Sequence, residues 1–284
     1  MATLNNYLTL IKFSHTVFAL PFALIGFFLA SSQFGFDWGN LVLILMCMVF
    51  ARSAAMAFNR YIDRDIDLKN PRTAQVREIP KGVISPKAAL LFVISTSLGF
   101  ILTTYFINTL CFYLSPIALI VVLGYSYTKR FTSLCHLVLG LGLALAPLGA
   151  YLAVSGEFAL SPILFSVAVL FWVSGFDIIY ALQDDTFDKE NKLNSIPVFL
   201  GRKKALNLSK FFHIITFLSL AYAGVLLEIH LLYWIGFALF SALLIYQHTI
   251  ISEKDLSRVN LAFFTTNGIA SVVFGVFVIL DFLL

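Results

Sequence analysis

The sequence predicts an all-α protein, a polytopic bundle of about nine transmembrane helices, and two observations carry this prediction. The chain is 60% hydrophobic and only 12% charged, whereas a soluble domain averages about 25% charged residues. Residues 88–128 contain no Asp, Glu, Lys or Arg. A helix of that length would be about twice as long as the hydrocarbon core of a bilayer is thick, so this run must fold back once. Asn108 lies midway along it and marks the turn.

Apolar runs of span length divide the chain into the predicted helices. These cover residues 13–32, 40–61, 87–107, 110–128, 133–154, 161–183, 206–227, 230–250 and 260–281. The first run ends in small residues, as a signal peptide does. It is longer than the usual apolar core of a signal peptide and follows a single Lys, so we interpret it as a retained span. The whole chain, 1–284, is expected to form one transmembrane domain.

The connections between these helices alternate in charge. Those near 33–39, 108–109, 155–160 and 228–229 contain no Lys or Arg, and those near 62–86, 129–132, 184–205 and 251–259 carry nearly all the basic residues. Because basic loops tend to stay in the cytoplasm, this pattern predicts an integral membrane protein with a cytoplasmic N-terminus. Topology therefore accounts for the net charge of +4, and no nucleic-acid partner is expected.

A first acidic cluster lies at the cytoplasmic end of the second predicted helix. Asn59, Asp63 and Asp67 are four residues apart, so on a helix they share one face, which drifts by about 40° per step. Arg52 precedes Asn59 by seven residues and falls on the same stripe. This face presents a cation, an amide and two carboxylates.

A second acidic cluster ends the sixth predicted helix. If that helix continues far enough, Asp177, Tyr180, Asp184 and Asp188 fall within an arc of about 80°. Both clusters belong to the same face of the membrane, where the active site is expected. The loops 62–86 and 184–205 are expected to be its cytoplasmic loops. For residues 68–86 two interpretations stay open, a lid over the site and a solvated connector.

The electrostatics of the two clusters favour bound metal. Stacked carboxylates repel one another, and burial at membrane depth adds a further cost. Mg²⁺ offsets both, because it prefers carboxylate, amide and water oxygens and commonly bridges to phosphate. Two facing clusters are expected to hold two Mg²⁺ ions with one diphosphate between them, and Arg and Lys would neutralise the remaining phosphate charge. The plainer interpretation is a set of ordinary interfacial acids among basic neighbours.

The two clusters also resemble the motifs of a known family. The spacing Asn59-x3-Asp63-x3-Asp67 is similar to the first acidic motif of the UbiA superfamily of intramembrane prenyltransferases, with Arg60 where a second Asp is usual. The run 177–188, followed by Ser-Ile-Pro at 195–197, resembles the second motif.

Further stretches agree with this resemblance. Residues 12–23 resemble the N-terminal signature of the family, and residues 125–130 resemble its fourth-helix motif. The Asn59-Arg60 pair and the Arg72-Thr73 loop look most like the 4-hydroxybenzoate polyprenyltransferase branch, which includes menaquinone-pathway relatives.

The resemblance implies a role for individual residues. It implies Mg²⁺ contacts from Asn59, Asp63, Asp67, Asp184 and Asp188. It implies diphosphate contacts from Arg52, Tyr125, Ser126 and Lys129. The carboxylates that it makes catalytic are Asp63, Asp184 and Asp188. The residues that it places at the acceptor pocket are His15 and Tyr180.

The activity implied by the resemblance is Mg²⁺-dependent transfer of a polyprenyl group from an allylic diphosphate to an aromatic acceptor. The acceptor is expected to be 4-hydroxybenzoate or a related aromatic carboxylate, in ubiquinone or menaquinone biosynthesis. The expected partners are polyprenyl diphosphate, the acceptor and membrane lipid, in a bacterial inner membrane. Alternatives are haem, chlorophyll or lipid ether acceptors and, from another class, a transporter with interfacial ion sites. A transporter should carry charges near the midplane, whereas both clusters lie at one face.

Other polar and small residues receive structural interpretations. Gly140, Gly142 and Gly149 are expected at close approaches between helices. Helix ends or interhelical hydrogen bonds are expected for His136, His213, His230 and His248. Asp281 is expected in a solvated terminus.

Overall fold

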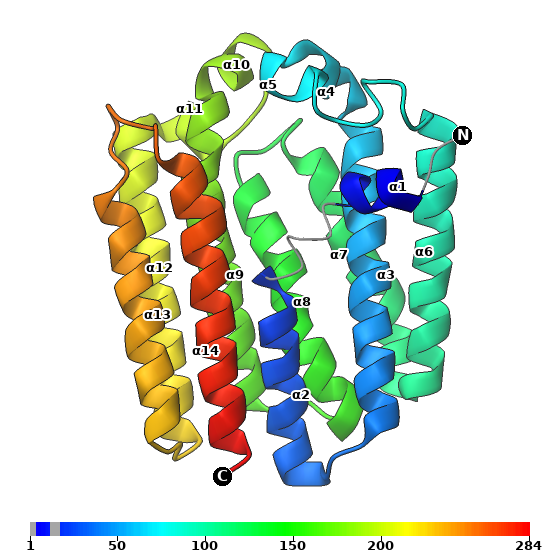
Figure 1. The fold of residues 1–284 in the computed structure, drawn as a ribbon, viewed down its shortest axis with the longest axis vertical. Helices are drawn as coiled ribbons and strands as arrows, with labels where there is room; N and C mark the ends of the chain where they lie inside the picture. The colour runs from blue at the N-terminus through cyan, green and yellow to red at the C-terminus, as the bar shows by residue number, and fades with distance from the viewer. Residues whose placement is uncertain (1–3, 12–17) are drawn as a thin grey trace.

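The computed structural model describes residues 4–11 and 18–284, and the regular structure within them is helical throughout (Figure 1). The long helices are α2 (Leu20–Phe34), α3 (Trp38–Ile62), α6 (Pro86–Ile107), α7 (Thr109–Thr128), α8 (Cys135–Ser155), α9 (Leu160–Ala181), α12 (Arg202–Leu226), α13 (Leu231–Thr249) and α14 (Asn267–Phe282). Eight spans in the described part are long and apolar enough to cross a membrane, and α2 is a shorter apolar helix of 15 residues. The predicted membrane bundle of about nine spans is confirmed.

Short helices gather at one end of the bundle (Figure 1). They are α4 (Arg64–Lys69), α5 (Pro71–Ala74), α10 (Asp185–Glu190) and α11 (Ile196–Leu200). The segments predicted as the loops 62–86 and 184–205 are therefore partly helical. A further short helix, α1 (Leu4–Leu10), lies toward the same end beside α3, and α14 ends at the opposite end (Figure 1).

Local capping explains several helix boundaries. Asn108 separates α6 from α7, as predicted: its Oδ1 accepts the Cys111 N–H at 2.8 Å, and its Nδ2 donates to the Leu152 carbonyl at 2.9 Å. The helix predicted from residue 206 begins earlier, at Arg202. Gly201 precedes it with φ 77°, a conformation that glycine adopts without strain, so the basic residues 202–204 form the first helical turn.

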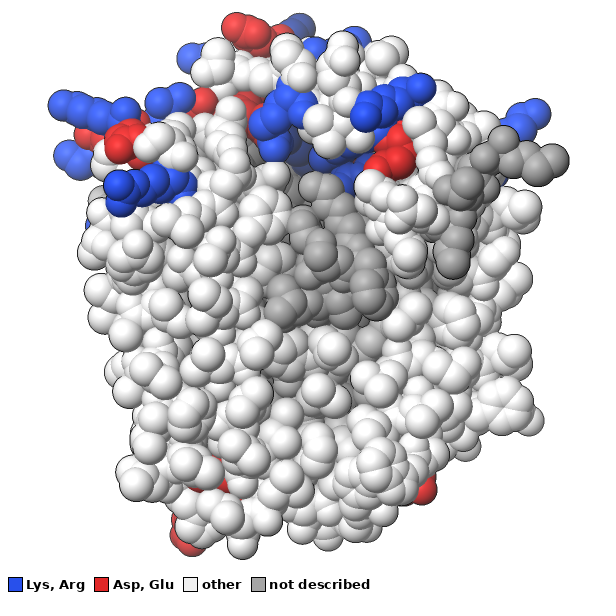
Figure 2. Space-filling model, in the orientation of Figure 1, with Lys and Arg blue, Asp and Glu red and all other residues white. Residues whose placement is uncertain are grey.

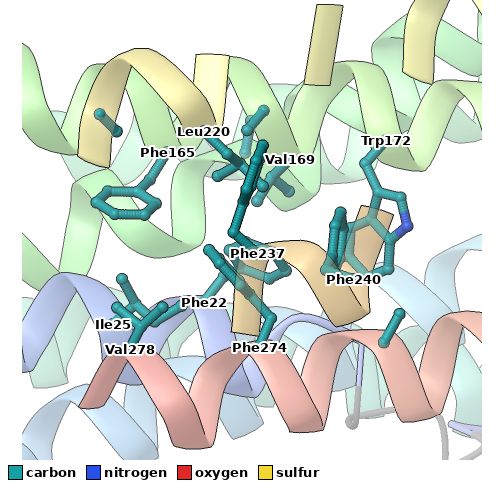
Figure 3. Close-up of a cluster of buried hydrophobic side chains, with 14 of the residues drawn as sticks. Phe22, Ile25, Phe165, Val169, Trp172, Leu220, Phe237, Phe240, Phe274 and Val278 are labelled. Atoms are coloured by element: carbon teal, nitrogen blue, oxygen red, sulfur yellow. The ribbon is translucent and has the colours of Figure 1, made fainter. Parts of the chain in front are cut away.

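The bundle is held by interdigitated aromatic side chains on one side of the cavity described below. Phe22, Trp172, Phe240 and Phe274 come from four helices and bury their rings together (Figure 3). The indole Nε1 of Trp172 donates to Asn267 Oδ1 at 2.9 Å, which satisfies its one polar atom. Many of the residues that face outward from the bundle are apolar, like those of the buried core. On α6, for example, Leu91, Leu98 and Leu102 are each about 60% exposed, as lipid contact requires.

Of the structural predictions made for glycines and for Asp281, the structure confirms one and contradicts the others. A Cβ at Gly140 would lie 2.3 Å from the Leu170 carbonyl oxygen, so the close approach predicted there is confirmed. A Cβ at Gly142 would make an ordinary van der Waals contact, 3.7 Å from Val122, and a Cβ at Gly149 would meet nothing within 4 Å. The prediction that these two glycines are needed for a close approach of helices is therefore wrong. Asp281 is buried rather than solvated, because its carboxylate accepts the N–H groups of His230 and Tyr233 at 3.0 and 3.1 Å and caps α13.

The histidines lie where they were predicted. His213 Nδ1 lies 2.8 Å from His248 Nε2, across α12 and α13. His230 precedes the first residue of α13.

The last span begins with a π-helical stretch, η3 (Leu261–Thr266), which leads directly into α14. It brings Phe263 and Phe264 against Tyr180 of α9, with ring centroids 4.1 and 5.9 Å from that of Tyr180.

Candidate active site

A cavity of about 630 Å³ lies inside the bundle, with its polar end at the short helices. Along α3 its lining runs from Asn59 to Ile44, a depth of about 22 Å at 1.5 Å per residue. Away from the polar end the walls are almost wholly apolar, with Met48, Leu114 and Leu145 as examples. On the face drawn in Figure 2, Lys and Arg gather at the end with the short helices, and the sides are nearly uncharged.

The first acidic cluster forms where α3 gives way to α4. Asp63 is the single residue between these helices. Its Oδ2 accepts a hydrogen bond from Asn59 Nδ2 at 2.8 Å, and Arg60 Nη1 donates to Asn59 Oδ1 at 3.0 Å. Burial raises the pKa of Asp63 to about 6, and the neighbouring carboxylate of Asp67 adds to this. A carboxyl group in this environment is stabilised as an anion by a nearby cation.

Asp67 lies deeper in the protein than Asp63 and Asn59 do. It is 4% exposed and forms an ion pair with Arg77. Asn59 and Asp63 line the cavity, whereas Asp67 does not. The common face predicted for these three residues is therefore only partly turned toward the cavity.

The second acidic cluster is joined to the loop after α4. α9 ends at Ala181, and a single 3-10 turn, Leu182–Asp184, separates it from α10. Asp184 accepts a hydrogen bond from Asn70 Nδ2 at 3.1 Å and is also bound by the Arg72 guanidinium, whose Nε lies 3.0 Å from Oδ1. Arg72 Nη1 donates to the Tyr180 hydroxyl at 2.8 Å. The segment 70–72 thus connects the two clusters across 112 residues of sequence.

Asp188 is the most deeply buried of the acids, with no exposed surface. Lys129 Nζ lies 2.7 Å from its Oδ1, and within the described residues its Oδ2 is buried without a hydrogen-bond donor. Asp63 Oδ1 is likewise buried without one. Buried carboxylate oxygens normally have partners, and a divalent cation is the partner that fits oxygens of this kind.

The described residues contain no group of three His, Cys, Asp or Glu side chains close enough to hold a metal unaided. Mg²⁺ is usually bound through one or two carboxylates, with substrate phosphates and water as the other ligands. The carboxylates present therefore fit a Mg²⁺ ion that arrives with a phosphate-bearing substrate.

The residues predicted to contact a diphosphate lie together. Arg52, Tyr125, Ser126 and Lys129 all line the cavity. Tyr180, predicted at the acceptor pocket, also lines it. His15, predicted at the same pocket, lies outside the described residues.

Three polar contacts of the site join partners that were not predicted from the sequence, although an interhelical hydrogen bond was expected for His136. His136 Nδ1 lies 2.7 Å from Asp177 Oδ2. Arg130 Nη2 donates to Asp65 Oδ1 at 2.8 Å, and this hydrogen bond lowers the pKa of Asp65. The amide of Asn70 reaches Asp184, as described above. Each joins residues from different helices or loops, so no local spacing signals it.

Fold and site together define a class of protein. Paired acids and cations at one end of a deep apolar cavity, inside a membrane bundle, suit an enzyme that acts on an anionic head group with a long lipid tail. The sequence profile of the UbiA prenyltransferase family matches residues 19–269. The chain belongs to this family and is a prenyltransferase.

Individual relatives agree with this assignment. The chain is 32% identical over 250 residues to the 4-hydroxybenzoate octaprenyltransferase of Thiobacillus denitrificans, covering 87% of this chain and 84% of the relative. Its fold is similar to the apo structure of a UbiA homolog from Aeropyrum pernix, with a TM-score of 0.85, 32% identity, and coverage of 94% of this chain and 98% of that one. A UbiA homolog from Archaeoglobus fulgidus bound to GPP and Mg²⁺ has a TM-score of 0.75 at 24% identity, covering 98% of this chain and 100% of that one. At that identity the likeness concerns the fold alone.

Proposed function

We propose that this prenyltransferase transfers a polyprenyl group from an allylic diphosphate to 4-hydroxybenzoate or a related aromatic carboxylate, in ubiquinone or menaquinone biosynthesis. The observation that carries the proposal is one cavity that combines an acidic and basic end with an apolar channel about 22 Å deep. A polyprenyl tail costs about 0.8 kcal/mol per CH₂ group to hold in water, so the apolar channel suits the tail. The names of the curated relatives support the acceptor.

The acidic residues are proposed to hold Mg²⁺, two ions bridged by the diphosphate. The proposed ligands are Asn59, Asp63, Asp67, Asp184 and Asp188. When bound, Mg²⁺ neutralises the negative charge that develops on the leaving diphosphate. The protein's own cations contribute to the same end, because Arg and Lys bind phosphate oxygens through charge-assisted hydrogen bonds.

The proposed counter-ions of the diphosphate are already beside the acids. Arg72, Arg77 and Lys129 form ion pairs with Asp184, Asp67 and Asp188. Metal binding at these carboxylates would exchange one cation for another and leave the basic side chains next to the phosphate. Arg52, Tyr125 and Ser126 line the same end of the cavity and complete the proposed diphosphate contacts.

The reaction breaks the allylic C–O bond, and the bonding electrons leave with the diphosphate. A ring carbon of the acceptor supplies the electron pair of the new C–C bond and then loses its proton to a base or to water. The developing allylic cation needs a dry, electron-rich environment. Phe18, Phe176 and Phe263 line the cavity near its polar end, and an aromatic face stabilises a nearby cation by about 0.5–2 kcal/mol.

The proposal extends to topology and location. The end of the bundle with the short helices is proposed to face the cytoplasm of a bacterium, with the N-terminus on that side of the inner membrane. The chain, 1–284, is proposed to be one transmembrane prenyltransferase domain, and the segments 62–86 and 184–205 are proposed as its active-site loops.

The proposal is tested with purified enzyme in nanodiscs, geranyl diphosphate, 4-hydroxybenzoate and Mg²⁺, with prenylated product measured by mass spectrometry. Product should disappear with EDTA, in Asp63→Ala and in Asp184→Ala. Glu157→Gln, an exposed acid in the connection before α9, should retain wild-type activity. Product that survives EDTA and both Ala variants would refute the assigned site, and absence of product with any aromatic acid would refute the acceptor class.

A further inference from the structure

A His–Asp pair lies in the wall of the cavity, apart from the carboxylates proposed for metal. Asp177 precedes Asp184 by seven residues, which places it about 10 Å deeper along α9. His136, at the start of α8, bonds Asp177 Oδ2 through Nδ1 at 2.7 Å. Both side chains line the cavity, the imidazole 3% and the carboxylate 21% exposed.

The hydrogen bonds of His136 fix its tautomer. The backbone N–H of Ile196 points at His136 Nε2 over 3.2 Å, so Nε2 is the acceptor. Ile196 is the first residue of α11, where backbone N–H groups have no partner within the helix. The ring proton therefore sits on Nδ1 and is donated to Asp177.

The backbone around this pair is also fixed. Ser174 Oγ donates to the His136 carbonyl at 3.1 Å, and Gly140 lets α8 approach the Leu170 carbonyl on α9. Among the described residues, the imidazole is the one hydrogen-bonding partner of Asp177. Its second oxygen, Oδ1, therefore remains an acceptor at the cavity.

Aromatic rings border the cavity beside this acceptor. Phe176 adjoins Asp177 in sequence and packs on Phe263 with 5.2 Å between ring centroids. Tyr180, one turn further along α9, stacks on Phe263 at 4.1 Å. A planar aromatic ligand that packs against the cavity side of these rings lies within reach of Asp177, which lines the same cavity.

We propose that Asp177 accepts a hydrogen bond from the ring hydroxyl of the aromatic acceptor and that His136 is the residue that positions it. This inference rests on the proposed function. It sets the orientation of the acceptor, because Asp177 repels the acceptor's own carboxylate and attracts its hydroxyl. A hydroxyl that donates to a carboxylate releases more electron density into the ring, chiefly to the carbons beside it. The neighbouring carbon is then the better nucleophile toward the allylic cation.

The substitution Asp177→Asn tests this directly. Because His136 Nδ1–H can bond only to an acceptor, the new amide must turn its oxygen to the imidazole and its NH₂ group to the cavity. The variant therefore exchanges an acceptor for a donor at constant shape. We would measure binding of 4-hydroxybenzoate and of benzoate to the enzyme in nanodiscs with Mg²⁺ and inorganic pyrophosphate, together with KM and kcat for 4-hydroxybenzoate.

The wild type should prefer 4-hydroxybenzoate over benzoate by about 10- to 100-fold, the range for a hydrogen bond to a charged group. Asp177→Asn should reduce this preference to about threefold or less and raise KM for the acceptor. Asp185→Asn is the matched control. Asp185 lies on α10, pairs with Arg202 and does not line the cavity, so this variant should keep the wild-type preference for 4-hydroxybenzoate over benzoate.

His136 supplies a second, independent pair of variants. His136→Asn keeps a donor near the position of Nδ1 and should retain most of the preference, whereas His136→Leu removes the donor and should lose it. If both Asp177→Asn and His136→Leu are less stable to heat but keep the wild-type preference, the pair only joins two helices and the inference is wrong. If wild-type enzyme forms no product with any hydroxylated aromatic acid, the proposed function itself is wrong.

Discussion

The approach of α8 to α9 at Gly140 yields a quantitative prediction. In Gly140→Ala the new Cβ would lie 2.3 Å from the backbone oxygen of Leu170 and 2.4 Å from Ser174 Oγ. A backbone carbonyl cannot rotate aside, so the two helices must separate. In Gly149→Ala, on the same helix, the new methyl group would meet nothing within 4 Å.

The two variants should therefore change stability in opposite directions. Alanine is favoured over glycine inside a helix by about 1 kcal/mol, and both variants gain this. Overpacking costs about 1–3 kcal/mol, and the short distance at Gly140 puts that site at the upper end. Gly140→Ala should lose about 2 kcal/mol of unfolding free energy, and Gly149→Ala should gain up to about 1 kcal/mol.

The assay is reversible unfolding of the purified protein in mixed micelles, with SDS as the denaturant and far-UV circular dichroism as the signal. Wild type and both variants are compared at one detergent composition. If Gly140→Ala is as stable as Gly149→Ala, the close contact of α8 with α9 is wrong, and so is the support that it gives to the His136–Asp177 pair.

Three further variants test other contacts. Asp281→Ala removes the cap of α13 and should cost about 1–2 kcal/mol in the same unfolding assay; no change would contradict the capping role. Trp172→Phe leaves Asn267 Oδ1 without its indole donor and should cost about 1–3 kcal/mol, with Trp38→Phe, an exposed indole, as the neutral control. Arg72→Lys keeps the charge but loses the paired contact with Asp184 and Tyr180. It should raise KM for the prenyl diphosphate about tenfold, and an unchanged KM would exclude Arg72 from substrate binding.

The sequence predicts the membrane bundle well because lipid restricts the alternatives. A run without charges as long as 88–128 can only cross the bilayer and return, and Asn108 supplies the hydrogen bonds that a one-residue turn between two spans needs. What could not be predicted depends on neighbours in space. Gly149 faces open space, although the apolar sequence around it resembles the sequence around Gly140. Asp281 is buried because the start of α13 lies beside it.

In the candidate site, too, contacts within one helix were predicted from the sequence and contacts between distant segments were not. Helical spacing brings Asn59 next to Asp63 and predicts the cluster at the end of α3. The contacts of Arg72 with Asp184 and of His136 with Asp177 join segments 112 and 41 residues apart, and no periodicity within one helix encodes such pairs. A 3-10 turn, Leu182–Asp184, also interrupts the helix that carries the second cluster, so the residues on either side of it do not keep the register of a continuous α-helix.

The π-helical stretch η3 makes the aromatic wall of the cavity sensitive to chain length. Phe263 and Phe264 are consecutive, yet both line the cavity. A π turn contains one residue more than an α turn needs, so deleting one residue within 261–266 would restore the α-helical register. Everything before the deletion would then rotate by about 100° relative to α14, and one of the two rings would leave the wall. At this point of the fold the shape of the site depends on the number of residues as much as on their identity, so an insertion or deletion alters it in a way that a point substitution cannot.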